Sequence, residues 1–175
     1  MGRRTKRSIL LAIAVVVIVV LLYLPVALAV SASWVHVYSG VPAGNATIDP
    51  TVPIYFPLSN EAPFSIPGFN PEYLMSVAIT NGSTKCSLLT LDGFIPCSTS
   101  TYVSVGSVMP GQAAYAVVYL TPDSKSFTIQ ASGYLQFLSQ RQRLSSVTYQ
   151  CTYVGTGQSS GTLDYPYAYS CKALH

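Results

Sequence analysis

The run Ile9–Val30 places twenty-two consecutive residues without a formal charge near the start of the chain. As an α-helix rising about 1.5 Å per residue, this run would be roughly 33 Å long. That length crosses the hydrocarbon core of a membrane, which is about 30 Å thick. Basic residues precede the run, and the next formal charge is Asp49. Because such basic flanks stay cytoplasmic, the sequence predicts a cytoplasmic leader (1–8), a hydrophobic helix (9–30) and an extracellular domain (31–175).

Two features of the run predict different fates for it. Pro25 should break the helix just ahead of Ala27 and Ala29, whose small-x-small spacing is typical of a signal peptide cut between Ala29 and Val30. The unbroken apolar stretch from Ile9 to Leu24 is longer than the 7–15 residues of a signal peptide core, and it favours retention as a membrane anchor.

A third fate rests on the residues before the run. Lys6, Arg7 and Ser8 followed by Ile9 resemble the processing site of archaeal type IV pilin precursors. In that family two charged residues and a small one precede a hydrophobic helix, which then packs in a filament core. The resemblance implies cleavage between Ser8 and Ile9. Bacterial pilins carry a Glu at the fifth mature position, where this chain has Ile13; archaeal pilins often lack that Glu too.

The predicted extracellular part is poor in charge. Residues 31–175 contain eleven charged side chains with a net charge near −1, against 34 Ser and Thr and twelve Tyr. They lack the basic patch that nucleic-acid binding requires. Tyr gives contact area at low entropy cost, so this composition suits packing between subunits. It equally suits secreted proteins of thermophilic archaea.

Four cysteines, Cys86, Cys97, Cys151 and Cys171, lie in this part, where disulfides persist. Proximity in sequence favours the pairs Cys86–Cys97 and Cys151–Cys171, although two other pairings remain open. Each such bond would contribute about 3 kcal/mol in the chain-entropy account. There is no C-x-x-C pair, so we expect neither a metal site nor a cofactor.

Alternating residues predict the first strands. Ser33–Ser39 reads as a strand that either begins the sheet or is donated to a neighbouring subunit. Thr51–Leu58 also alternates, and Pro53 and Pro57, which lack N–H groups, predict that it is an edge strand. Leu74–Thr80 and Thr84–Leu91 flank Asn81-Gly82, a pair typical of a tight hairpin.

Later strands follow at intervals of about ten residues, and no further amphipathic helix is predicted. Their ranges are Tyr102–Met109, Gln112–Leu120, Lys125–Ser132, Tyr134–Leu138, Leu144–Val154 and Thr162–Cys171. The expected fold is all-β: an antiparallel immunoglobulin-like β-sandwich preceded by one hydrophobic helix. Asn45 and Asn81 begin N-glycosylation sequons at places where the backbone should be exposed.

One stretch matches a catalytic motif. Residues 157–161 fit G-x-S-x-G, and Asp164 and His175 follow in the order found in hydrolases. The motif needs a strand that feeds a helix, whereas this stretch is a Gly/Ser loop between strands. We therefore expect no enzymatic activity.

These observations favour a structural subunit or adhesin of an archaeal extracellular filament. The partners would be further copies of the chain, the membrane through the helix, and a surface glycan, with no nucleic acid. A membrane-anchored extracellular binding module and an archaeal virus coat or envelope protein are the alternatives. The expected intersubunit contacts are Trp34, Tyr38, Tyr165, Tyr167 and Tyr169.

Overall fold

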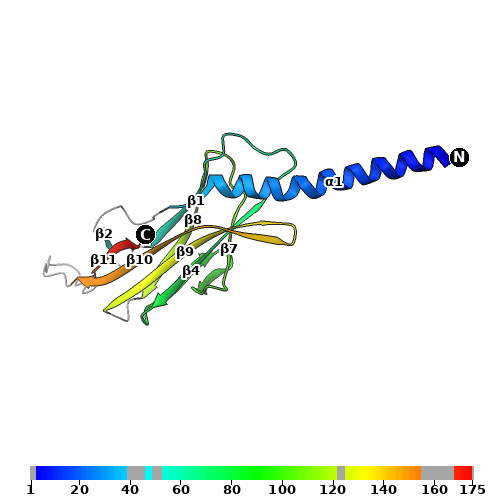
Figure 1. Ribbon diagram of the computed structural model, residues 1–175. Helices are drawn as coiled ribbons and strands as arrows, with labels where there is room; N and C mark the ends of the chain where they lie inside the picture. The colour runs from blue at the N-terminus through cyan, green and yellow to red at the C-terminus, as the bar shows by residue number, and fades with distance from the viewer. Residues whose placement is uncertain (1–2, 39–45, 49–52, 122–124, 155–167, 175) are drawn as a thin grey trace.

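The computed structural model describes residues 3–38, 46–48, 53–121, 125–154 and 168–174. Helix α1 (Arg3–Trp34) projects from one end of a two-layered β-domain (Figure 1). The strands are β1 (Val35–Val37), β2 (Ala46–Ile48), β3 (Ile54–Asn60), β4 (Glu72–Asn81), β5 (Lys85–Thr90), β6 (Gly93–Pro96), β7 (Val103–Gly106), β8 (Ala113–Thr121), β9 (Ser126–Phe137), β10 (Gln140–Val154) and β11 (Ala168–Leu174).

Two antiparallel sheets form the sandwich. The five-stranded sheet has the order β1-β3-β8-β5-β6, and the six-stranded sheet has the order β2-β11-β10-β9-β4-β7. Alternate side chains of both sheets point inward, and the buried ones include Phe56, Met75, Leu88, Phe127 and Tyr149. The predicted β-sandwich behind a single apolar helix is therefore confirmed.

The hairpin predicted around Asn81-Gly82 is wrong. Strand β4 pairs with β7 and β9, whereas β5 pairs with β6 and β8, so the turn carries the chain from one sheet to the other. Gly82 has a φ of +97°, and a Cβ there would lie 2.7 Å from the Ser126 carbonyl oxygen. A tight turn with a positive φ serves both a hairpin and a crossing between sheets, and glycine adopts that φ without strain. The Asn-Gly pair is therefore compatible with either connection.

Pro53 and Pro57 predicted an edge strand, but β3 does not lie at the edge of its sheet. It lies between β1 and β8, but β1 pairs only with its last residues, from Leu58 to Asn60. The Pro57 carbonyl oxygen accepts a hydrogen bond from the Tyr38 N–H at 2.9 Å, so Pro57 turns its backbone toward the β1 side. Because β1 has three residues, it leaves the remainder of that side of β3 without a ladder partner.

Pro25 does not break the helix. Helix α1 continues through it to Trp34, so the strand predicted over Ser33–Ser39 is reduced to Val35–Val37. Proline removes one intrahelical hydrogen bond and disfavours the helix interior. Here the turns after Pro25 pack on the domain through Ala27 and Leu28, which offsets that cost.

Both disulfides join the pairs that proximity favoured. Cys86–Cys97 links β5 to the segment after β6, with 5.3 Å between the Cα atoms. Cys151 and Cys171 face each other directly in the register of β10 and β11, with 4.0 Å between the Cα atoms. The second bond is buried in the core and fixes the pairing of these two strands.

Candidate functional site

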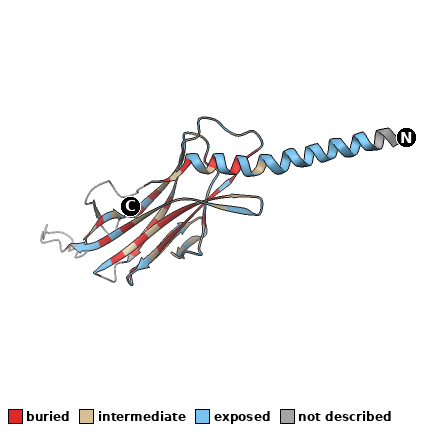
Figure 2. Ribbon diagram, viewed as in Figure 1, coloured by how far each residue is buried: buried red, intermediate tan, exposed pale blue. Residues whose placement is uncertain are grey.

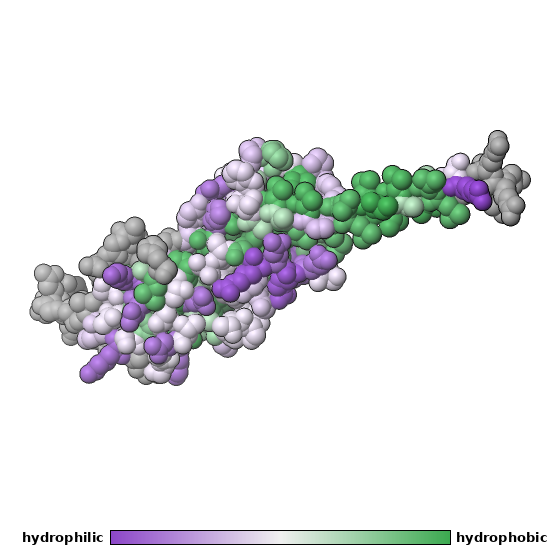
Figure 3. Space-filling model, viewed as in Figure 1, coloured by the Kyte–Doolittle hydropathy of each residue, from purple (hydrophilic) through white to green (hydrophobic). Residues whose placement is uncertain are grey.

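Helix α1 has an uncovered half and a seated half. From Ile9 to Tyr23 every large apolar side chain is 43–66% exposed, and Figure 2 shows the projecting half as exposed throughout. Figure 3 shows that half as a continuous hydrophobic rod with hydrophilic residues at its N-terminal end. In the seated half, Ala27 (3% exposed) and Leu28 (6%) belong to the hydrophobic core of the sandwich.

A segment that we call the strap (residues 61–71, between β3 and β4) holds α1 at the end of its seated half and at Tyr23, where the uncovered half ends. The Glu61 N–H donates a hydrogen bond to the Trp34 carbonyl oxygen at 2.8 Å, and the Tyr23 hydroxyl donates to the Pro67 carbonyl oxygen at 2.5 Å. Tyr23 and Trp34 are about 16 Å apart along the helix. The strap therefore fixes the helix to the domain at two separated points. No strand, helix or site was expected in this segment, and its three prolines are the one signal in the sequence that marks it.

A cavity of about 170 Å³ lies where the strap, the end of α1 and the segment before β8 meet. Asn60 is in its wall, and its side-chain N–H donates to the Val108 carbonyl oxygen at 2.8 Å. Its side-chain oxygen accepts from the Ala62 N–H at 3.1 Å. Both polar atoms of this buried amide are therefore hydrogen-bonded, one to the segment before β8 and the other to the strap. The cavity is below the ~300 Å³ of ordinary ligand sites, so it is part of the helix seat.

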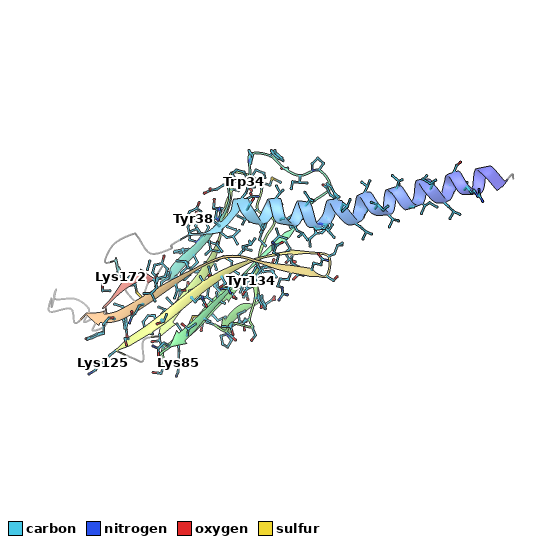
Figure 4. All side chains as sticks on the ribbon, viewed as in Figure 1. Trp34, Tyr38, Lys85, Lys125, Tyr134 and Lys172 are labelled. Atoms are coloured by element: carbon cyan, nitrogen blue, oxygen red, sulfur yellow. A yellow bond between two sulfur atoms is a disulfide. The ribbon has the colours of Figure 1, made fainter. Side chains whose placement is uncertain are left out.

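Trp34 and Tyr38, two of the expected contact residues, lie at the base of the helix (Figure 4). Both are partly exposed. The Tyr38 hydroxyl donates a hydrogen bond to the Glu61 carboxylate at the start of the strap. That bond stabilises the neutral phenol and is the main reason why the pKa of Tyr38 is raised; desolvation and the Glu61 charge add to it.

Of the three C-terminal tyrosines predicted as intersubunit contacts, Tyr169 lies within the described residues, and it is buried. Tyr169 is 2% exposed and packs its ring 5.0 Å from that of Phe127, inside the sandwich. It shares the inward face of β11 with Cys171, so it is not available to another subunit. Tyr165 and Tyr167 lie outside the described residues.

The two predicted processing points sit differently on α1. Ser8 and Ile9 are on its exposed half. Ala29 and Val30 are exposed as well, but they follow the core residues Ala27 and Leu28 directly. Cleavage after Ala29 would remove those two residues from the sandwich, whereas cleavage after Ser8 would leave the seat intact.

The structure describes only some of the remaining predicted positions. Asn81 is exposed at the end of β4, while Asn45 lies outside the described residues. The G-x-S-x-G stretch, with Asp164 and His175, also lies outside them. Within the described ranges no group of three or more His, Cys, Asp or Glu side chains could hold a metal ion.

Helix α1 contains one candidate membrane span, Arg7–Trp34, which is long and apolar enough to cross a bilayer. Comparison of the chain with protein families, with curated proteins and with solved structures finds no match.

Proposed function

We propose that the protein is a structural subunit of an extracellular filament of the archaeal type IV pilus kind, with the exposed half of α1 forming the filament core. The observation that carries this proposal is the attachment of the helix to the domain at two separated points. Helix α1 passes into β1 without an intervening residue, and the strap holds it at Tyr23 and Trp34.

A filament needs a fixed attachment of this kind because helical symmetry repeats one geometry between the core helix and the outer domain. A membrane-anchored binding module has no such requirement. The length and apolar character of α1 also allow it to cross a bilayer, so the attachment of the helix to the domain, and not its length, favours the filament.

The uncovered helix also supplies the driving force for assembly. Its thirteen large apolar side chains between Ile9 and Tyr23 are each roughly half exposed. Covering them would contribute on the order of 10 kcal/mol per subunit, given about 1.5–3 kcal/mol for burying one such side chain completely. The two disulfides and the exposed sequon at Asn81 fit a location outside the cell.

The mature N-terminus and the physical state of the protein test this proposal together. Mass spectrometry of the protein from sheared cell surfaces should find a chain that begins at Ile9 in a sedimenting polymer. An intact N-terminus on a monomer in the membrane fraction would instead establish the anchored module. A chain that begins at Val30 would contradict both. A coat protein would be found in released particles rather than in surface shear fractions.

A further inference from the structure

The outer face of the five-stranded sheet carries a row of aromatic side chains that faces solvent. Tyr55 is 49% exposed, Tyr115 56% and Phe94 62%; Leu89 beside them is 39% exposed. They point outward because their neighbours in sequence, such as Ile54, Phe56 and Leu88, fill the core. We call this surface the aromatic face, and define it by Tyr55, Leu89, Phe94, Tyr115 and Tyr119.

The strand register brings these rings together. The Tyr55 and Tyr115 ring centroids are 6.4 Å apart, and those of Phe94 and Tyr119 are 5.2 Å apart, both in edge-to-face geometry. Leu89 lies opposite Phe94 in the pairing of β5 and β6. Among the outward-facing residues within the described strands of this five-stranded sheet, Lys85 is the one that carries a charge. The face is therefore continuous, apolar and nearly neutral.

The area of the face indicates what covers it. With about 150–250 Å² for a fully buried aromatic side chain, its exposed part comes to on the order of 400 Å². That is comparable to the largest apolar patch of a typical monomer, about 300–600 Å², and such patches are often functional. It is about half of the ~800 Å² per partner in a stable two-protein interface. The face is thus suited to a contact made in addition to another one.

We propose that the aromatic face packs against a second copy of this chain, as the lateral contact between the outer domains of the filament. This inference rests on the proposed function, in which the helices of the same copies supply the other contact. Helix α1 packs along β1 and β10 and leaves the aromatic face uncovered.

The opposite surface of the sandwich is the counterpart. The outer face of β9 and β10 presents the uncharged, hydrogen-bonding side chains of Thr128, Gln130, Thr148, Gln150 and Thr152, and Arg141 and Arg143 lie on the same face at the other end of β10. Contact between two unlike faces is head-to-tail, and it propagates from copy to copy, whereas contact between two aromatic faces would close into a dimer. Propagation is what a filament requires. Tyrosine hydroxyl groups can pair with these amides and hydroxyls.

Hydroxyl-radical footprinting of the wild-type polymer against detergent-dispersed monomer tests the contact without a mutation. Tyr55, Phe94 and Tyr115 should be oxidised severalfold less in the polymer, while Tyr153, which lies outside both faces, should be oxidised equally in the two states. Equal oxidation of the aromatic face would overturn the inference. So would protection that appears only after a soluble polysaccharide is added, because a glycan would then be the occupant.

Thiol cross-linking tests the direction of the contact. The double variant Ser87→Cys, Gln150→Cys should give a ladder of oligomers with a flexible bismaleimide, whereas each single variant should give monomers. Dimers from Ser87→Cys alone, or no ladder from the double variant, would refute the head-to-tail contact. If the wild-type chain forms no polymer, the proposed function fails as well. A polymer with an unprotected aromatic face removes only the present inference.

Discussion

At the scale of single residues, Gly133 shows how closely the two sheets approach. A Cβ at this position would lie 2.7 Å from the Val37 Cγ2 atom and 3.1 Å from the Leu58 Cδ1 atom. Strand β9 continues through Gly133, although the sequence predicted two separate strands, Lys125–Ser132 and Tyr134–Leu138, on either side of it. The residue is glycine because the five-stranded sheet lies against it, and only tertiary packing makes that visible.

Gly133→Ala should therefore destabilise the protein. Inserting a methyl group into a filled site costs typically about 1–3 kcal/mol, and we expect a loss of that size in the free energy of urea unfolding. Gln130→Ala, at an outward position on the same strand, is the matched control and should change stability by less than about 0.5 kcal/mol. Equal stability of the glycine and alanine proteins would show that the sheets relax apart there.

At the scale of elements, α1 is a single helix with two environments. Leu22 and Leu28 are the same residue type six positions apart, yet Leu22 is exposed and Leu28 is buried in the core. Hydropathy treats them alike, because it contains no information about which turns the domain covers. The boundary between the two environments lies close to Pro25 and the Tyr23–Pro67 hydrogen bond.

The pair Leu28→Ala and Leu22→Ala separates these environments. Leu28→Ala should lower the free energy of unfolding of the detergent-dispersed chain by about 2–5 kcal/mol, as truncations of buried leucine do. Leu22→Ala should leave it nearly unchanged and should instead make the polymer easier to dissociate by detergent. If Leu22→Ala destabilised the dispersed chain as much as Leu28→Ala, the two-environment description of α1 would be wrong.

At the scale of the whole molecule, the sandwich is incomplete without the seated half of the helix. The core contains Ala27 and Leu28, and the strap is held through Tyr23. A chain that begins at Tyr23 keeps all three residues, whereas a chain that begins at Val30 loses them. Signal-type cleavage after Ala29 would therefore expose the core of the exported domain.

The two truncated chains provide a direct measurement. The chain that begins at Val30 should unfold at a lower temperature than the chain that begins at Tyr23. The difference should correspond to a loss on the order of 3 kcal/mol of apolar burial. Near-ultraviolet circular dichroism of the aromatic residues reports both transitions. Coincident melting curves would mean that the domain does not depend on the helix and that signal-type cleavage is structurally harmless.

Local sequence patterns determined the apolar helix, the alternating strands and the cysteine pairs, because each depends on residues near in sequence or on composition. They also singled out Trp34 and Tyr38, which the structure leaves partly exposed at the base of the helix. They could not place Tyr169, since alternation defines two faces of a strand but not which of them meets the other sheet. Nor could they assign β4 and β5 to different sheets, because the Asn-Gly turn permits a hairpin and a crossing equally.

Tertiary structure decided these points, and it divided one uniform apolar run into a seated half and an uncovered half. The physical reason is that burial belongs to pairs of surfaces that are distant in the chain.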